Sequence, residues 1–99
     1  LLPGAKAPHF NYVGNSIIGF GANLGAGVKL SNVRNDKREI AVSLQDGSKI
    51  NSGLRKLGAM IGDNCQLGCN VVTNPGAIMP PSSMISPNET VTGWLESKF

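Results

Sequence analysis

The stretch from Lys6 to Gly27 contains His9, the only histidine of this 99-residue chain, followed by the glycine-rich run NLGAG at 23–27. An imidazole can accept a proton near neutral pH, so it can serve as general base when an amine attacks a carbonyl carbon. A backbone N–H beside a glycine can approach that carbonyl oxygen and stabilise its developing negative charge. The pair of features indicates acyl transfer to an amine, although a lone histidine near a glycine-rich turn is more often a structural residue.

The two cysteines do not form a recognisable metal or disulfide motif. Cys65 and Cys69 are four positions apart and have no histidine nearby. Zinc sites and disulfide frameworks have different spacings. We therefore expect reduced thiols in a cytoplasmic protein and no metal in this domain.

The net charge of +3 arises between residues 34 and 56. The cations of this segment outnumber its acids: Arg34, Lys37, Arg38, Lys49, Arg55 and Lys56 face Asp36, Glu39 and Asp46. A short basic cluster suits a small anion such as phosphate, whereas a nucleic-acid surface usually combines a longer basic stripe with aromatic residues. The segment predicts either a phosphate site or a solvated loop, with no nucleic acid as partner.

The elements that position these groups follow a period of six. Large residues return at Tyr12, Ile18, Leu24 and Leu30, and again at Ile61, Leu67, Thr73, Met79, Ile85 and Val91. Small or slender residues stand four positions later, at Ser16, Ala22, Val28, Cys65, Val71, Ala77 and Ser83. This hexapeptide pattern predicts an all-β parallel β-helix, in which three short strands form a triangular coil of about eighteen residues and the coils stack.

Each class of residue has an expected place in such a coil. The large residues fill the interior and the small ones fit the corners, so Cys65 is expected to be a slim core residue. Gly19, Gly25, Gly62 and Gly68 directly follow large positions, where we expect tight or unusual backbone angles. An α-helix is excluded, because its apolar residues would recur every three or four positions.

The repeat is interrupted between Leu30 and Ile61, which are not a multiple of six apart. The run EIAVSLQDGSKI at 39–50 alternates apolar and small residues before the turn pair Asp46-Gly47. We expect a projecting loop or hairpin at about 33–56. At the other end, Trp94 and Leu95 are expected to close the stack, because terminal repeats need a cap.

The chain as a whole predicts one hexapeptide-repeat domain over residues 1–99. Its first residues, Leu1-Leu2 before Pro3, are too short an apolar run for a signal peptide or a membrane span. We interpret the chain as a C-terminal fragment of a longer soluble enzyme, with no membrane partner.

A specific family resemblance rests on the motif KAxHxxYxGNxxIGxxxNLGAG at 6–27. The motif closely resembles the acetyltransferase domain of bifunctional glucosamine-1-phosphate N-acetyltransferase/UDP-N-acetylglucosamine pyrophosphorylases. The runs NVRNDK at 32–37 and GLRKLGAMIGDNCQLGCN at 53–70 look more like the archaeal-type sugar nucleotidyltransferases with the same kind of tail. The resemblance implies a left-handed coil, a homotrimer with acyl-donor grooves between subunits, and an upstream nucleotidyltransferase domain.

The resemblance also implies roles for individual residues. His9 would be the general base, with Tyr12 and Asn23 on the sugar phosphate or sugar hydroxyls and Asn32 on the amine or the pantetheine arm. Acetyl-CoA would be the donor, with Gly25, Ala26 and Cys69 on its side of the site and the Ala26 N–H facing the thioester oxygen. Either Lys37 or Arg38 would hold the phosphate, because the loop before them differs from the bacterial pattern.

Several of these residues also have structural interpretations. Tyr12 occupies a large repeat position and could pack inward. Asn23 and Asn32 could be turn residues, Gly25 could serve only the coil corner, and Arg55 and Lys56 could be a solvated pair.

The sequence therefore favours an acetyl-CoA-dependent N-acetyltransferase that acts on an amino-sugar 1-phosphate such as glucosamine 1-phosphate, in UDP-N-acetylglucosamine synthesis. The alternative is a non-catalytic trimerising domain of a sugar-1-phosphate nucleotidyltransferase. A zinc enzyme of the carbonic anhydrase type would need three histidines at one metal, and this chain has one.

Overall fold

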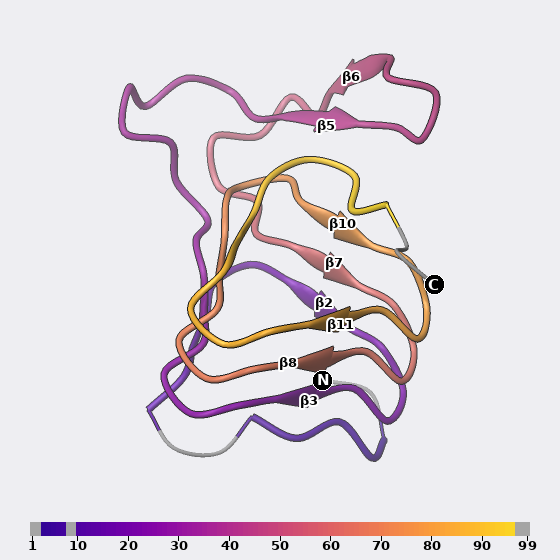
Figure 1. The fold of residues 1–99 in the computed structure, drawn as a ribbon. Coiled ribbons are helices and arrows are strands. Elements are labelled where there is room, and N and C mark those ends of the chain that lie inside the picture. Colours follow the sequence, from indigo (N-terminus) through magenta and orange to yellow (C-terminus); the bar gives the residue numbers. More distant parts are fainter. Residues whose placement is uncertain (1–2, 8–9, 97–99) are drawn as a thin grey trace.

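The computed structural model describes residues 3–7 and 10–96, and its regular elements are short β-strands (Figure 1). Within those residues there is no helix long and apolar enough to cross a membrane. In chain order the strands are β1 Tyr12–Val13, β2 Ile17–Ile18, β3 Asn23–Leu24, β4 Lys29–Leu30, β5 Ala41–Ser43, β6 Lys49–Asn51, β7 Met60–Ile61, β8 Gln66–Leu67, β9 Val72–Thr73, β10 Ile78–Met79, β11 Met84–Ile85 and β12 Thr90–Val91.

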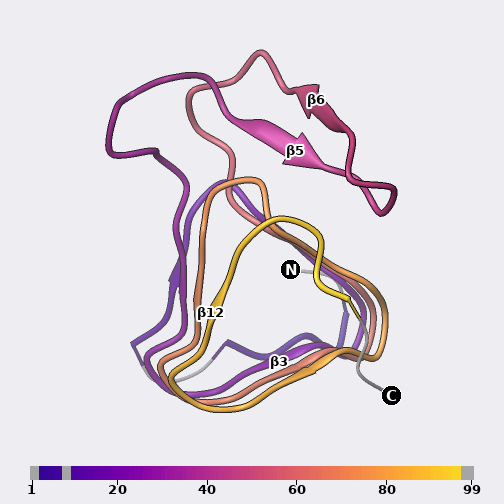
Figure 2. The same ribbon diagram turned by 45° about the horizontal axis from the view of Figure 1, so that its top comes forward.

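Ten of these strands stack as three parallel sheets, which form the sides of a triangular coil (Figure 2). The sheet orders are β1-β4-β9-β12, β2-β7-β10 and β3-β8-β11. In the regular part, Ile61 pairs with Met79 and Leu67 with Ile85, each 18 residues further along the chain. The predicted all-β stack of hexapeptide coils is confirmed, and it is consistent with a left-handed β-helix.

The large repeat positions form the interior of the stack. Ile18, Leu24, Leu30 and Met79 are at most 1% exposed, and Cys65 is fully buried as expected. Burial raises the pKa of the Cys65 thiol, which lies 3.1 Å from the Pro80 carbonyl oxygen. The core is therefore a column of aliphatic side chains with slender residues at its corners.

Tyr12 departs from the expected pattern, because the first coil is one residue short. Val13, not Tyr12, aligns with the inward-facing Leu30, while Tyr12 aligns with the outward-facing Lys29, 17 residues later. Tyr12 is consequently 52% exposed. Its assignment to a large interior position was wrong, and its side chain is free to contact other groups on the outside of the coil.

The expectation of unusual angles directly after the large residues was also wrong. The positive-φ corner residues lie three positions after a large residue, at Gly21, Gly27, Asn64, Asn70, Gly76, Ser82 and Asn88. Gly25 is needed instead because coils stack closely: a Cβ added there would lie 2.8 Å from the Cys69 backbone nitrogen. The glycines after large positions thus reflect contact between coils, and Asn supplies many of the left-handed corners.

The predicted hairpin is confirmed as β5 and β6, which pair antiparallel. The intervening turn closes with a hydrogen bond from the Gly47 N–H to the Leu44 carbonyl, 2.9 Å, and Gly47 has φ +88°. Its left-handed angle explains the glycine after Asp46. Ile18 pairs with Ile61, 43 residues later, so the excursion adds 25 residues to an 18-residue coil without changing the register.

The hairpin lies against the stack and does not project freely. Ile40, just before β5, is 1% exposed, and a Cβ added to Gly76 on the coil would lie 2.8 Å from the Ala41 carbonyl oxygen. At the C-terminal end, the Leu95 N–H donates to the Ile78 carbonyl at 2.8 Å and the Leu95 side chain packs on the core. Trp94 forms a parallel bridge with Ile78, so the predicted cap is confirmed.

Candidate functional site

Three polar side chains from the first two coils form a hydrogen-bonded chain on the outside of the stack. The Tyr12 hydroxyl donates to Asn32 Oδ1 at 3.0 Å, and Asn32 Nδ2 donates to Asn15 Oδ1 at 2.6 Å. All three side chains remain accessible to solvent. The structure therefore brings together two of the predicted substrate residues, Tyr12 and Asn32, and adds Asn15.

Gly14 makes this arrangement possible. A Cβ at that position would lie 2.6 Å from Asn32 Cγ and 2.8 Å from Tyr12 Cε1, so a larger residue would push the two side chains apart. The backbone secures them further, because the Asn32 carbonyl accepts the Leu57 N–H at 2.9 Å and the Asn15 carbonyl accepts the Gly58 N–H at 2.9 Å. The point where the excursion returns to the stack is thus fixed to the same two asparagines.

A basic cavity lies beside this return point. Val33, Lys37, Arg55 and Lys56 line a cavity of about 290 Å³. In the described part of the chain, none of these three cations has a carboxylate at ion-pair distance, because the ion pairs there join Arg34 and Arg38 to Asp36. The cavity therefore carries an uncompensated positive charge suited to an anion.

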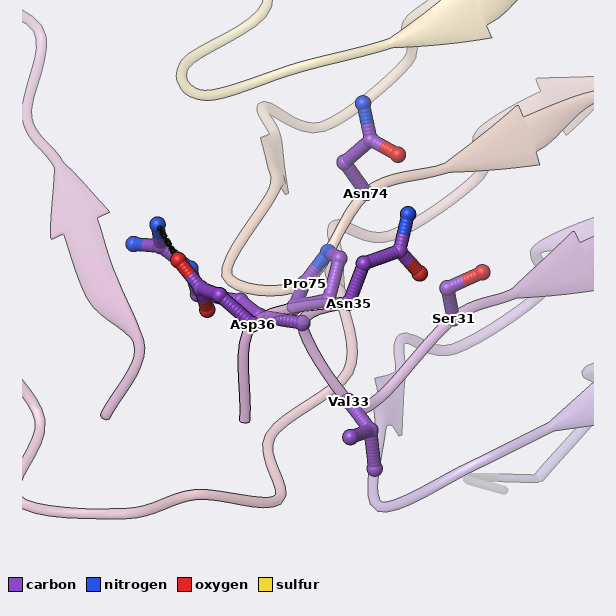
Figure 3. Close-up of a pocket in the computed structure, with 7 residues that line it drawn as sticks. Ser31, Val33, Asn35, Asp36, Asn74 and Pro75 are labelled. Carbon is purple, nitrogen blue, oxygen red and sulfur yellow. Dashed lines mark hydrogen bonds and ion pairs between the residues drawn. The ribbon is translucent and has the colours of Figure 1, made fainter. Parts of the chain in front are cut away.

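A second, polar cavity of about 430 Å³ lies on the other side of Val33 (Figure 3). Asn35 and Asn74 line it together with the ion pair of Arg34 and Asp36, whose closest atoms are 2.6 Å apart. The Arg38 backbone N–H and the Arg34 guanidinium hold the pKa of Asp36 below its usual value. Asp36 thereby neutralises Arg34 and leaves the positive charge on the other side of Val33.

The predicted donor residues meet at one corner of the stack. Gly25 and Ala26 lie between β3 and β4, directly over Cys69, which occupies the same place between β8 and β9. The Ala26 carbonyl accepts the Asn70 N–H at 2.8 Å, and the Gly25 carbonyl accepts Asn11 Nδ2 at 3.1 Å. Cys69 is exposed at this corner.

The neighbouring corner shows what is special about Ala26. Phe20 stands two positions after Ile18 as Ala26 does after Leu24, and its N–H donates to Asp63 Oδ1 at 2.8 Å. At the Ala26 corner, Cys69 takes the place of that aspartate. Among the hydrogen bonds of the described residues, none has the Ala26 N–H as donor. This N–H is therefore available to a ligand.

The remaining predicted residues are not joined to either group. Asn23 lies in β3, where its backbone N–H donates to the Cys65 carbonyl at 2.9 Å, so it is a strand residue on another side of the coil from Tyr12. Arg38 is exposed and its backbone N–H donates to Asp36 at 3.1 Å. His9 lies outside the described residues. The described residues contain no group of three His, Cys, Asp or Glu side chains able to hold a metal ion.

Comparison with known proteins gives the family context of this site. No family model matches the chain. A bifunctional sugar-1-phosphate nucleotidylyltransferase/acetyltransferase from Sulfurisphaera tokodaii is 41% identical over 91 residues, which are 92% of this chain and 22% of that protein. The bifunctional protein GlmU of Methanococcus maripaludis strain C7 is 40% identical over 88 residues, 89% of this chain and 21% of that protein.

The chain is homologous to these bifunctional acetyltransferases. The resemblance read from the motif at 6–27 is confirmed, and the chain spans about a fifth of the length of the first curated relatives that it matches. A putative uncharacterized acetyltransferase, YaiX of Escherichia coli K12, is 35% identical over 80 residues, 81% of this chain and 34% of that protein. The named acetyltransferase function is thus shared by relatives of different length.

Sequence reasoning missed two residues of the site. The Gly14-Asn15 pair is a common turn signal, and Asn15 does adopt the left-handed region with φ 44°. That signal predicts a turn and gives no hint of the contact with Asn32. Asn11 has no sequence signal, because its contact with Gly25 depends on how the short first coil lies against the second.

Proposed function

We propose that this chain is an acetyl-CoA-dependent N-acetyltransferase domain that acts on an amino-sugar 1-phosphate. The observation that carries the proposal is the junction of an uncompensated basic cavity with the hydrogen-bonded pair Tyr12 and Asn32. A sugar phosphate offers an anion for the first and hydroxyl and amino groups for the second. The names of the relatives support the acetyl transfer.

In this proposal the phosphate binds in the basic cavity. Lys37, Arg55 and Lys56 supply three cations that converge on it from both ends of the excursion. Lys37 is a better phosphate ligand than Arg38, whose N–H and guanidinium lie near the Asp36 carboxylate. Tyr12 and Asn32 then contact the sugar and its amino group, while Asn23 contributes from β3.

The reaction joins the amino nitrogen to the acetyl carbon. His9, which precedes Asn11 by two positions in the sequence, removes a proton from the amine as its lone pair attacks the thioester carbon. The Ala26 N–H stabilises the negative charge on the thioester oxygen, beside Gly25 and Cys69. The C–S bond then breaks, and the departing coenzyme A thiolate takes up a proton.

The domain would work within a longer cytoplasmic protein. The matched relatives have about five times the length of this chain and are named as bifunctional nucleotidylyltransferases and acetyltransferases or as GlmU. We propose that an upstream nucleotidyltransferase domain uses the acetylated sugar phosphate, and that three chains assemble so that donor grooves lie between neighbouring coil stacks.

His9→Ala tests the chemistry of this proposal. We expect acetyl transfer to glucosamine 1-phosphate to fall by about a hundredfold or more, because a positioned general base contributes on that scale. The rate of the unaltered chain is expected to fall on acidification, since a protonated imidazole cannot accept the amine proton. Steady-state rates over a pH series measure both effects.

Two controls make the result interpretable. Binding of coenzyme A to His9→Ala, measured by calorimetry, is expected to stay unchanged, since the base does not contact the donor in its ground state. Lys56→Ala is expected to raise the KM for the sugar phosphate, whereas Lys49→Ala, a cation on β6 outside the basic cavity, is not. Near-normal transfer by His9→Ala would contradict the proposed role and favour the non-catalytic assembly domain.

A further inference from the structure

The side chain of Asn11 connects the first coil to the corner that carries the predicted acyl-donor residues. Its Nδ2 donates to the Gly25 carbonyl oxygen at 3.1 Å, across 14 positions of sequence. Its Oδ1 is buried and has no hydrogen-bond partner among the described residues. Burying an amide oxygen without a partner is unfavourable, so the single contact with Gly25 fixes this side chain at a cost to stability.

The contact with Gly25 also determines the direction of the Ala26 N–H. The Gly25 carbonyl and the Ala26 N–H belong to one planar trans peptide, so they point in opposite directions. A donor that holds the carbonyl on one side therefore aims the N–H to the other. Hydrogen bonding to the carbonyl oxygen also polarises the peptide and strengthens its N–H as a donor.

The neighbouring corner achieves the same orientation in a different way. There the Phe20 N–H is held directly by the Asp63 carboxylate, 2.8 Å away. At the Ala26 corner an acceptor in that place would occupy the N–H that the reaction needs, and Cys69 stands there instead. The orientation has to come from the carbonyl side of the peptide, where Asn11 lies.

We propose that Asn11 is a positioning residue for acetyl transfer, which holds the Gly25–Ala26 peptide so that the Ala26 N–H faces the thioester oxygen. The inference rests on the proposed function, because it needs an acyl donor at this corner. It assigns to Asn11 an effect on the transition state, where the oxygen carries negative charge, and little effect on ground-state binding.

Asn11→Asp is the sharpest variant, because it keeps the size of the side chain and removes the N–H donor. We expect kcat to fall at least tenfold with the KM for acetyl-CoA nearly unchanged, since loss of a whole oxyanion donor costs about a hundred- to a thousandfold. Asn11→Ala is the second variant and should show the same division between kcat and KM. An unchanged kcat in both would overturn the proposal.

A readout independent of activity comes from the amide proton of Ala26. In ¹⁵N-labelled chain we expect acetyl-CoA, added without acceptor, to shift the Ala26 N–H resonance strongly, and to shift it much less in Asn11→Asp. The Phe20 N–H is the matched control, because it is bound to Asp63 and should not respond in either protein. An equal Ala26 shift in both proteins would overturn the inference.

These outcomes separate the inference from the proposed function. If acetyl-CoA leaves Ala26 unchanged in the unaltered chain, the assignment of the donor corner fails and the inference fails with it. If the unaltered chain responds and the Asn11 variants respond equally, only the inference fails. If both variants lose the dispersed spectrum of a folded chain, Asn11 is a structural residue and the inference is overturned.

Discussion

The two thiols of this chain lie in opposite surroundings and should differ in reactivity. Cys65 is fully buried in the core, where burial raises its pKa and leaves little thiolate near neutral pH, whereas Cys69 is exposed at the Ala26 corner. We expect a thiol reagent to label one cysteine of the native chain rapidly and the second after denaturation. Absorbance of the released chromophore measures both steps.

Cys69→Ser is the matched variant and should abolish the rapid step while leaving the slow one. Fast labelling of two thiols in the native chain would contradict the burial of Cys65. Because Cys69 lies directly under Gly25, a bulky adduct on it is also expected to weaken the binding of coenzyme A.

Single residues were predicted well where the repeat fixes them. The six-residue period placed Cys65 and the large aliphatic residues inside, because every coil above and below imposes the same register. Tyr12 was misplaced because the first coil is one residue short, and the period carries no sign of this. Lys56 gave a charge signal in the sequence but no indication that it would lie near Asn32.

At the scale of elements, the excursion can be shortened at a defined place. Ile40 and Ser52 already pair through the hydrogen bond from the Ser52 N–H to the Ile40 carbonyl, 3.0 Å. Replacing residues 41–51 by a two-residue Asn-Gly turn should keep that pair and leave the thermal unfolding of the coils nearly unchanged. We expect weaker binding of the sugar phosphate, because the shortened loop no longer steadies the basic cavity at its base. Calorimetry and circular dichroism measure the two properties.

Ile40→Ala provides the comparison. Because Ile40 is 1% exposed, its truncation should lower the free energy of unfolding by about 2–4 kcal/mol, more than loss of the hairpin tip. Global unfolding of the shortened chain would show that the hairpin is an integral part of the coil.

The element types were predictable and their contacts were not. The alternation at 39–50 and the Asp46-Gly47 turn predict a hairpin from local chemistry alone. Its close approach to Gly76 depends on a coil more than thirty residues away, and no local pattern encodes that contact.

At the scale of the whole molecule, one stack leaves much apolar surface exposed. Ile17, Phe20 and Met84 are 63%, 55% and 61% exposed, and they lie on two different sides of the coil or at the corner between them. Burial of such residues between neighbouring stacks would stabilise an assembly. We expect a homotrimer of about three times the 10.3 kDa chain mass. Sedimentation at micromolar concentration measures it.

Ile17→Asp is expected to weaken that assembly, because an ionised carboxylate is costly to bury in an apolar interface. A monomer of unaltered chain under the same conditions would contradict the trimer and leave the donor groove without a neighbouring wall.

The 25-residue excursion has a consequence for how such proteins diversify. The chain leaves the stack after one coil and re-enters it in register, since Ile18 still pairs with Ile61 as Ile61 does with Met79. Both edges of the break are held by coils whose own repeat is intact. A gene for this fold can therefore gain, lose or exchange the segment in a single event and still encode the same stack, so that specificity for the acceptor can evolve separately from the scaffold.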